Sequence, residues 1–224
     1  DDYSVLGQVS SLGAGHYQVQ FKLMSLVTQQ LLTGERFQSV SQSQLRALAH
    51  HISDEIYQYI TGIPGVFSTH LAYVAVEHPT SRDAVYQLVV SDVDGANPHV
   101  LLRQIGVPIA SPIWSPDGGH VAYVSYLNNR MVVYTIDVAT GARRLVANYP
   151  GMNSAPAYSP DGKTLALALS MGSSDQTNIY LLNLETRRLT QLTHLGTNTS
   201  PHFSPQGNRI VFTSDRTGNP QLYQ

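Results

Sequence analysis

The sequence contains no cysteine, which excludes disulfide bonds, thiolate catalysis and cysteine-ligated zinc. Charged residues are scarce as well, at 12% of the chain against a usual share of about 25%. The net charge is −2, so there is no electrostatic case for binding nucleic acid or an anionic membrane surface. No apolar run approaches the roughly 18 residues that cross a bilayer, and no signal peptide is recognisable. What remains is a composition rich in uncharged polar residues, which suits a β-protein with many turns.

One motif occurs three times at a nearly constant interval. It reads Ser-Pro-Ile-Trp-Ser-Pro-Asp-Gly from Ser111 to Gly118 and recurs from Ser154 to Gly162. A third, worn copy, which is degenerate because glutamine replaces the aspartate, runs from Ser200 to Gly207. Aligned on the serine before the second proline, the copies are 44 and then 45 residues apart. A period of about 40 to 50 residues is typical of the four-stranded blades of a β-propeller.

Residues 65–224 follow this period with short strands and polar turns, and they predict about three and a half blades. The second and third blades have four strands each, whereas the first lacks an obvious innermost strand. The last blade stops at Gln224, partway into its third strand, and the chain begins without methionine in a strand pattern. Three and a half blades do not close a ring of four to eight. We therefore expect a mainly β fold, a partial β-propeller, in a chain that is part of a longer protein.

Residues 1–64 have a different pattern and predict a small α+β domain, incomplete at its start. Strands are expected at residues 3–9, 17–24 and 36–40, with a turn at Thr33–Glu35. A helix is expected to begin after Ser41 or Ser43 and to end at Gly62, before Pro64. Its apolar residues recur every three or four positions and are expected to form one buried stripe: Leu45, Leu48, Ala49, Ile52, Ile56, Tyr59 and Ile60.

The binding surface of a propeller is usually the mouth of its central channel, which is lined by the loops that lead into the innermost strands. These loops are predicted at Val107–Ser111, Gly151–Ala155 and Thr197–Ser200. They are neutral, small and able to form hydrogen bonds, which suits a polypeptide partner better than a phosphate or a metal. The Ser-Pro-Asp-Gly motif itself is expected to form turns that hold these loops in place.

No catalytic constellation emerges from the sequence. The Gly-x-Ser-x-Gly elbow of serine hydrolases is absent, since Met171–Asp175 lacks the second glycine. Asp92–Asn97 hints at a calcium loop but has no glycine at its sixth position, so a hairpin turn is expected. His50 and His51 each precede an acid by four residues on the helix, yet no third metal ligand can be named. The prediction is a protein that is not an enzyme and has no cofactor or metal.

Several segments together resemble the TolB family, over residues 2 to 224. The helix ends in His50-x-x-Ser-Asp-Glu55 and then Ile60–Gly65, the first blade opens with Ala72–Val74, and a Ser91–Gly95 turn precedes the repeats. The propeller repeat alone is weakly specific, because many periplasmic and peptidase propellers share it. Its combination with the helix-end and first-blade segments is specific.

The resemblance implies a periplasmic, non-catalytic scaffold of the Tol–Pal system with a six-bladed propeller. Such a protein binds the lipoprotein Pal at the channel mouth, communicates with TolA through its leading segments, and supports outer-membrane integrity and cell division. Other outer-membrane proteins and bacteriocins are further expected partners. TolA binding depends on a leading segment that this sequence does not show. The implied Pal-binding residues are Met152, Asn153, Ser154, Ala155, Asn198, Thr199 and Ser200, with Ala110, Ser111 and His202 as secondary candidates.

Two other functions stay open from the residues alone. A prolyl oligopeptidase-like serine peptidase carries a similar propeller, and a Gly-x-Ser-x-Gly elbow elsewhere in the longer protein would favour it. A carbohydrate-binding propeller would need aromatic residues at the channel mouth, where these loops have almost none.

Overall fold

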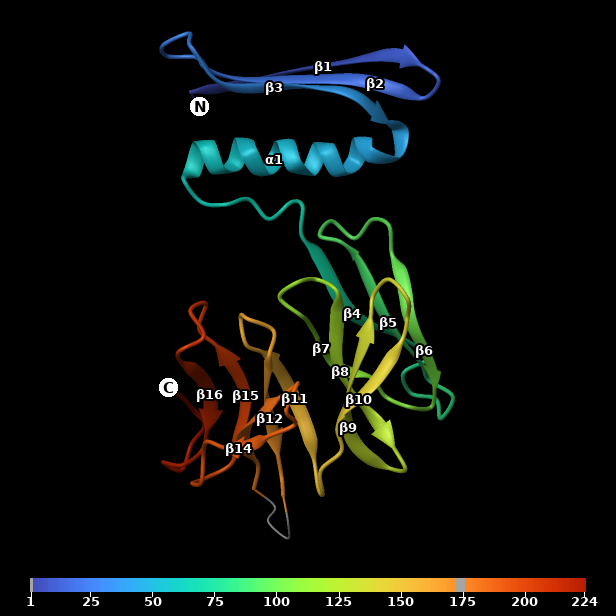
Figure 1. Ribbon diagram of the computed structural model, residues 1–224, viewed down its shortest axis with the longest axis vertical. Helices are drawn as coiled ribbons and strands as arrows, with labels where there is room; N and C mark the ends of the chain where they lie inside the picture. Colours follow the sequence, from blue (N-terminus) through green and yellow to red (C-terminus); the bar gives the residue numbers. More distant parts are fainter. Residues whose placement is uncertain (1, 172–175) are drawn as a thin grey trace. The chain divides into compact units, whose positions relative to one another are not determined.

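The computed structural model describes residues 2–171 and 176–224 (Figure 1). Most of the Met171–Asp175 segment, considered above for a catalytic serine, therefore lies outside the described residues. Contacts divide the chain into two units. The first is Asp1–Leu71 with Ser91–Asn97, and the second is Ala72–Val90 with Pro98–Gln224. The division predicted between residues 64 and 65 stays a prediction.

The first unit contains a three-stranded antiparallel sheet and a helix that lies along it (Figure 1). Strand β2 is central, and its alternating side chains Val19, Phe21 and Leu23 are buried, as its period-two pattern predicts. The elements are β1 (Tyr3–Gly13), β2 (His16–Ser25), β3 (Leu31–Ser41), the short 3₁₀ helix η1 (Gln42–Gln44) and α1 (Leu45–Thr61).

The turn predicted at Thr33–Glu35 is wrong, because these residues lie inside β3. Gly34 is needed there for a different reason. A Cβ atom on Gly34 would lie 2.7 Å from the carbonyl oxygen of Phe21 on β2. A glycine in a strand can mark such a close approach of two backbones as well as a turn.

The two ends of the helical segment agree with the prediction. The Ser41 N–H donates to Oε1 of Gln44 (3.0 Å), which caps the start of η1, and Gly62 ends α1 in the left-handed conformation with φ 73°. The predicted burial is wrong, however, since no residue of α1 is fully buried. Tyr59 and Ile60 are 49% and 41% exposed. The small sheet shields the apolar stripe only in part.

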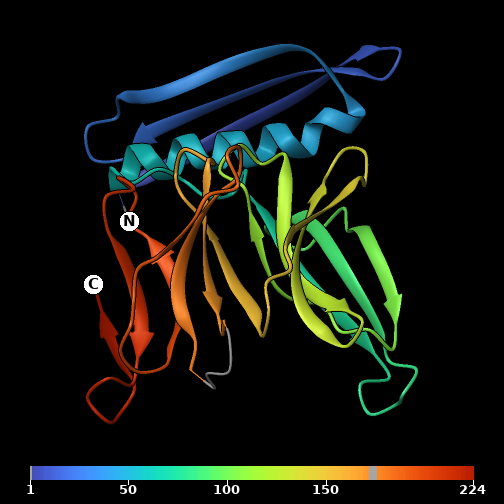
Figure 2. The same cartoon turned by 60° about the horizontal axis from the view of Figure 1, so that its bottom comes forward.

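The second unit consists of four small sheets placed side by side, as Figure 2 shows. The second and third sheets have four antiparallel strands, and the first and last have three, as the sequence predicts. The sheets are β4 (His70–Glu77), β5 (Val85–Asp92) and β6 (His99–Ile105); β7 (Ala110–Trp114), β8 (His120–Leu127), β9 (Arg130–Asp137) and β10 (Arg143–Ala147); β11 (Asn153–Tyr158), β12 (Thr164–Leu169), β13 (Asn178–Asn183) and β14 (Leu189–Gln191); and β15 (Asn198–Phe203), β16 (Ile210–Ser214) and β17 (Gln221–Tyr223).

The core of this unit lies between neighbouring sheets. Leu88 of the first sheet packs in one cluster with Tyr123 and Ile136 of the second. A second cluster joins Val133 of the second sheet to Leu167 of the third. The described core thus joins each sheet to its neighbour, as expected for a repeat whose units bury their faces by stacking.

The Ser-Pro-Asp-Gly motif forms the expected turns. In the first copy the carboxylate of Asp117 accepts hydrogen bonds from the hydroxyl of Ser115 and from the N–H of Gly119 (3.0 Å). These two bonds, the hydroxyl first, lower the pKa of Asp117, and Gly118 has a φ of 69°. The worn third copy has no such aspartate, and Asn208 accepts from the Ser204 hydroxyl instead (3.1 Å).

Candidate partner-binding site

The loops chosen from the sequence come together on the innermost strands of three sheets. These strands are β7, β11 and β15, and β11 contacts both of the others. Figure 2 shows the sheets fanned side by side around these strands. We call the loops that lead into them the rim loops; they are residues 106–111, 151–155 and 196–200.

Each rim loop contains a non-glycine residue in the left-handed conformation. The residues are Ser111, Ala155 and Ser200, with φ of 50°, 48° and 51°. Each one precedes a proline, although a following proline disfavours helical backbone. The register of the strand pair shifts at each of these points, which marks a β-bulge. β-Bulges and strained backbone conformations are common next to functional sites. Three equivalent bulges therefore make the rim loops the candidate binding site.

Asn153 holds the second rim loop from inside. Its side chain is fully buried, and Oδ1 accepts the N–H of Tyr149 at 2.9 Å. Its Nδ2 donates to the carbonyl oxygens of Tyr149 (2.8 Å) and of Met131 (3.1 Å), which lies on β9 of the preceding sheet. The amide therefore ties the loop to the neighbouring sheet.

Asn198 does the same in the third rim loop. It is also fully buried, and its Nδ2 donates to the carbonyl oxygens of Gly196 (2.9 Å) and Thr177 (3.3 Å). Arg216 donates to its Oδ1 at 3.0 Å. In the first loop the buried Ile109 stands one residue before Ala110, at the place that corresponds to these asparagines.

Three glycines, 45 residues apart, begin the rim loops: Gly106, Gly151 and Gly196. All three have positive φ, between 67° and 82°. A Cβ atom on Gly151 would lie only 1.8 Å from the carbonyl oxygen of Ser170 at the end of β12. The second rim loop thus lies so close to the end of β12 that only glycine, which has no Cβ atom, fits at this position.

Two polar side chains accept hydrogen bonds from the backbone of the rim loops, next to these glycines. The N–H of Met152 donates to Oγ of Ser170 (2.8 Å), and the N–H of Thr197 donates to Oδ1 of Asp215 (2.6 Å). Sequence reasoning missed Ser170, Asp215, Gly106 and Gly196, and it placed Gly151 in a loop without recognising its role. The 45-residue spacing of the glycines was a signal that could have revealed them.

The predicted binding residues fall into three groups by exposure. The exposed residues are Ala110, Ser111, Met152, Ser200 and His202; the half-buried residues are Ser154, Ala155 and Thr199; the buried residues are Asn153 and Asn198. Buried side chains with satisfied hydrogen bonds position the rim rather than face a partner. Partner binding by these residues stays a prediction. The exposed residues are the members of the set that can contact a partner.

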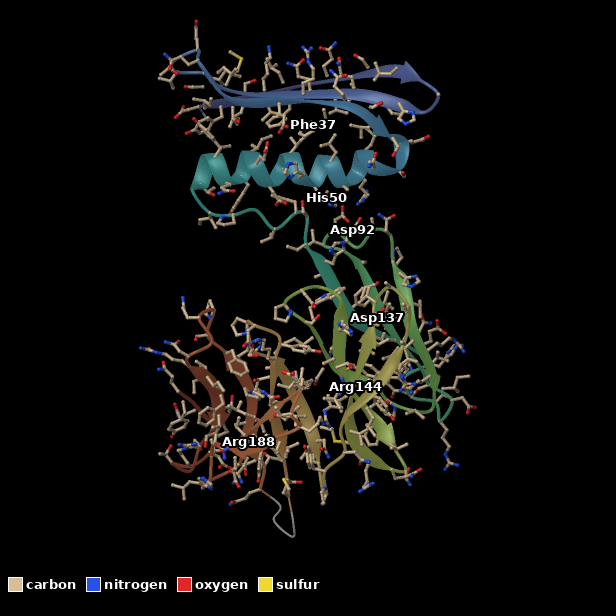
Figure 3. All side chains as sticks on the ribbon, in the orientation of Figure 1. Phe37, His50, Asp92, Asp137, Arg144 and Arg188 are labelled. Atoms are coloured by element: carbon tan, nitrogen blue, oxygen red, sulfur yellow. The ribbon has the colours of Figure 1, made fainter. Side chains whose placement is uncertain are left out.

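A second polar cluster lies in the first unit, around the turn after β5. Arg46 of α1 donates to the carboxylates of Asp92 (3.2 Å) and Asp94, and His50 Nε2 lies 3.2 Å from Asp94 Oδ2. His50 and Asp92 are labelled in Figure 3. Residues Asp92–Asn97 connect the antiparallel strands β5 and β6, which confirms the predicted hairpin turn. The two aspartates of this turn bind side chains of α1.

The pKa of Asp94 gives a direct test of this cluster. The Arg46 guanidinium, followed by the N–H of Ala96, lowers the pKa of Asp94 from 3.8 to about 2. A depressed pKa stabilises the fold above pH 3.8, and this contribution is lost as the pH falls through about 2. We expect the Arg46→Gln variant to raise the pKa of Asp94 towards 3.8, as followed by NMR titration of its carboxyl carbon. An unchanged titration would contradict the ion pair, and Arg103→Gln serves as the control.

Among the described residues, no helix is long and apolar enough to span a membrane.

Comparisons with known proteins agree with the resemblance drawn from the sequence. A family model described as the TolB β-propeller domain matches residues 57–224. The Tol-Pal system protein TolB of Francisella tularensis subsp. mediasiatica is 48% identical over 223 residues, which cover 99% of this chain and 51% of that protein. The corresponding protein of Bordetella pertussis is 45% identical over 227 residues, which cover 100% of this chain and 49% of that protein. The chain thus spans about half the length of the curated relatives it matches.

Solved structures give the same result. The crystal structure of TolB from Acinetobacter baumannii superposes with a TM-score of 0.87 at 37% identity, covering 99% of this chain and 54% of that one. A putative TolB from Agrobacterium tumefaciens, at 17% identity and a TM-score of 0.56, shares the fold, with 96% of this chain and 72% of that one covered. Because the family model accounts for most of its length, the chain belongs to the TolB β-propeller family.

Proposed function

We propose that the chain is a non-catalytic scaffold that binds a partner polypeptide at its rim loops, and that this partner is the lipoprotein Pal of the Tol–Pal system. The observation that carries the proposal is the recurrence of a left-handed bulge at Ser111, Ala155 and Ser200. The bulge interrupts the strand pairing at each position. Each rim loop has an exposed side chain at the bulge or close to it, namely Ser111, Met152 and Ser200.

The chemistry of the rim favours a polypeptide partner. Apart from His202, the candidate residues carry no ionisable side chain, so hydrogen bonds and apolar contacts have to supply the affinity. Met152 is 38% exposed and is the adaptable apolar contact of the rim. Its backbone is held by Ser170, which limits the entropy lost on binding.

Membership of the family supports a wider role, which is part of this proposal. In this proposal the protein acts in the periplasm, links Pal to TolA, and supports outer-membrane integrity and cell division. Other outer-membrane proteins and bacteriocins are additional partners. No cofactor is required for any of these roles.

Titration of the chain with the purified soluble domain of Pal tests the proposal, with calorimetry as the measurement. We expect Met152→Glu and Ala110→Glu to weaken binding at least about tenfold, because a carboxylate at the contact loses its water without gaining a partner. Leu145→Glu is the matched control, since Leu145 is also 38% exposed but lies on the outermost strand β10. Equal affinity of the rim variants and the wild type would refute the rim as the site. Absence of Pal binding by both the chain and its longer form would refute the partner.

A further inference from the structure

We propose that Glu35, His51 and Glu55 form a binding site for a divalent metal ion, with Zn²⁺ as the best fit. One ligand atom from each of the three side chains lies within 4.8 Å of the other two. Nε2 of His51 is 3.7 Å from Oε1 of Glu55. A nitrogen and two carboxylate oxygens are a ligand set that zinc accepts.

The fold supplies the third ligand that the sequence could not identify. His51 and Glu55 are four residues apart and so lie on the same face of α1. Glu35 is on β3, where it pairs in register with the buried Phe21 of β2. Because side chains alternate along a strand, Glu35 shares its face with Phe37. The ring of Phe37 meets the ring of His51 edge to face at 6.2 Å, which places this face of β3 against the helix (Figure 3).

The local charges favour a bound cation. The first 71 residues contain three Lys or Arg residues, namely Lys22, Arg36 and Arg46. Lys22 and Arg36 lie on the opposite face of the sheet, where Arg36 donates to Gln20 (3.1 Å). Arg46 is bound to Asp92 and Asp94. The two glutamates therefore face one histidine, and a divalent ion would neutralise them more completely than that ring can.

The geometry needs only a small adjustment to close around an ion. Zinc binds nitrogen and oxygen at about 2.0 to 2.2 Å, so its ligands lie roughly 3.3 Å apart. Glu35 is exposed, and a change of side-chain rotamer is enough to cover this distance. Phe37 holds the imidazole ring from its edge, and the apolar wall it forms strengthens the attraction between ion and carboxylates. With three protein ligands, a fourth position stays open for water or a further ligand.

Such an ion would link β3 to α1. It would stabilise the first unit because the three ligands come together only in the folded state, so that the ion binds the folded chain in preference to the unfolded one. Calorimetric titration of the untagged, EDTA-treated chain with ZnCl₂ tests this. We expect one site of micromolar affinity, about tenfold or more weaker in Glu35→Gln and in His51→Ala. Glu185→Gln and His99→Ala are the matched controls, because both residues are exposed and lie outside the cluster. Their affinity should equal that of the wild type.

A thermal melt provides the second measurement. Zinc should raise the melting temperature of the wild type and of both controls, and at the same zinc concentration should raise that of Glu35→Gln clearly less. The proposal is overturned if the wild type binds no zinc, or if Glu35→Gln and His51→Ala bind it as tightly as the wild type. Because all three side chains are exposed or half-buried, the variants are expected to fold, and circular dichroism verifies this.

Discussion

Replacing Gly151 by alanine is expected to lower the free energy of unfolding of the second unit by about 3 kcal/mol. Two costs add up. Gly151 has a φ of 82°, where an L-residue is disfavoured by about 1 to 2 kcal/mol. The new Cβ would also lie 1.8 Å from the carbonyl oxygen of Ser170, so the backbone of the rim loop or of β12 has to move. Flexible side chains cannot relieve this contact, because the obstructing atom belongs to the main chain.

Gly141→Ala separates the two costs. Gly141 has a φ of 70°, but nothing lies within 4 Å of a Cβ built on it. This variant should therefore lose only about 1 kcal/mol, from the conformational cost alone. Urea unfolding followed by the fluorescence of Trp114, the only tryptophan, reports on the second unit. Equal losses in the two variants would show that the close approach at Ser170 does not constrain the rim.

The repeat made the propeller predictable from the sequence. Proline, aspartate and glycine have fixed effects on a turn, so the Ser115–Gly118 copy could be interpreted from its residue types alone. The structure adds hydrogen bonds to Asp117 that match this interpretation. The worn copy was predictable only in part, because the role of Asn208 depends on its position after the turn.

The errors have a common physical origin, which is contact between distant segments. The sequence predicts a turn at Gly34, since it does not show that the carbonyl oxygen of Phe21 would lie 2.7 Å from a Cβ atom at this position. The periodicity of α1 predicts a buried stripe, because a periodic pattern gives the direction of a face but not the size of the sheet that covers it. His51 and Glu55 lacked a third ligand for the same reason, since Glu35 approaches only through the fold.

The structure brings the three predicted loops together on adjoining strands, but residue type alone does not reveal the role of each side chain within them. An asparagine in a loop looks like a donor and acceptor for a partner. In the structure the amide of Asn153 binds main-chain groups, and the amide of Asn198 binds main-chain carbonyls and the side chain of Arg216. Ser111 and Ser200, in contrast, remain exposed. Burial decides between the two roles, and burial depends on the neighbouring sheet.

Asn153→Ala tests this distinction and is expected to cost about 3 kcal/mol of unfolding free energy. The change leaves the N–H of Tyr149 and the carbonyl oxygen of Met131, both in half-buried residues, without the side chain that satisfies them. Each unsatisfied group costs about 1 to 3 kcal/mol. The exposed Asn219 supplies the control, since Asn219→Ala should change stability by less than about 0.5 kcal/mol.

Partner binding then separates the structural role of Asn153 from a contact role. A fully buried amide cannot touch Pal, so the folded fraction of Asn153→Ala should keep its affinity within about threefold, less than 1 kcal/mol. Met152→Glu should show the opposite behaviour, with weaker binding and nearly unchanged stability, because Met152 is exposed. Calorimetry well below the melting temperature measures affinity, and Trp114 fluorescence measures stability. A large loss of affinity in a folded Asn153→Ala would mean that the loop opens on binding and that Asn153 is itself part of the contact.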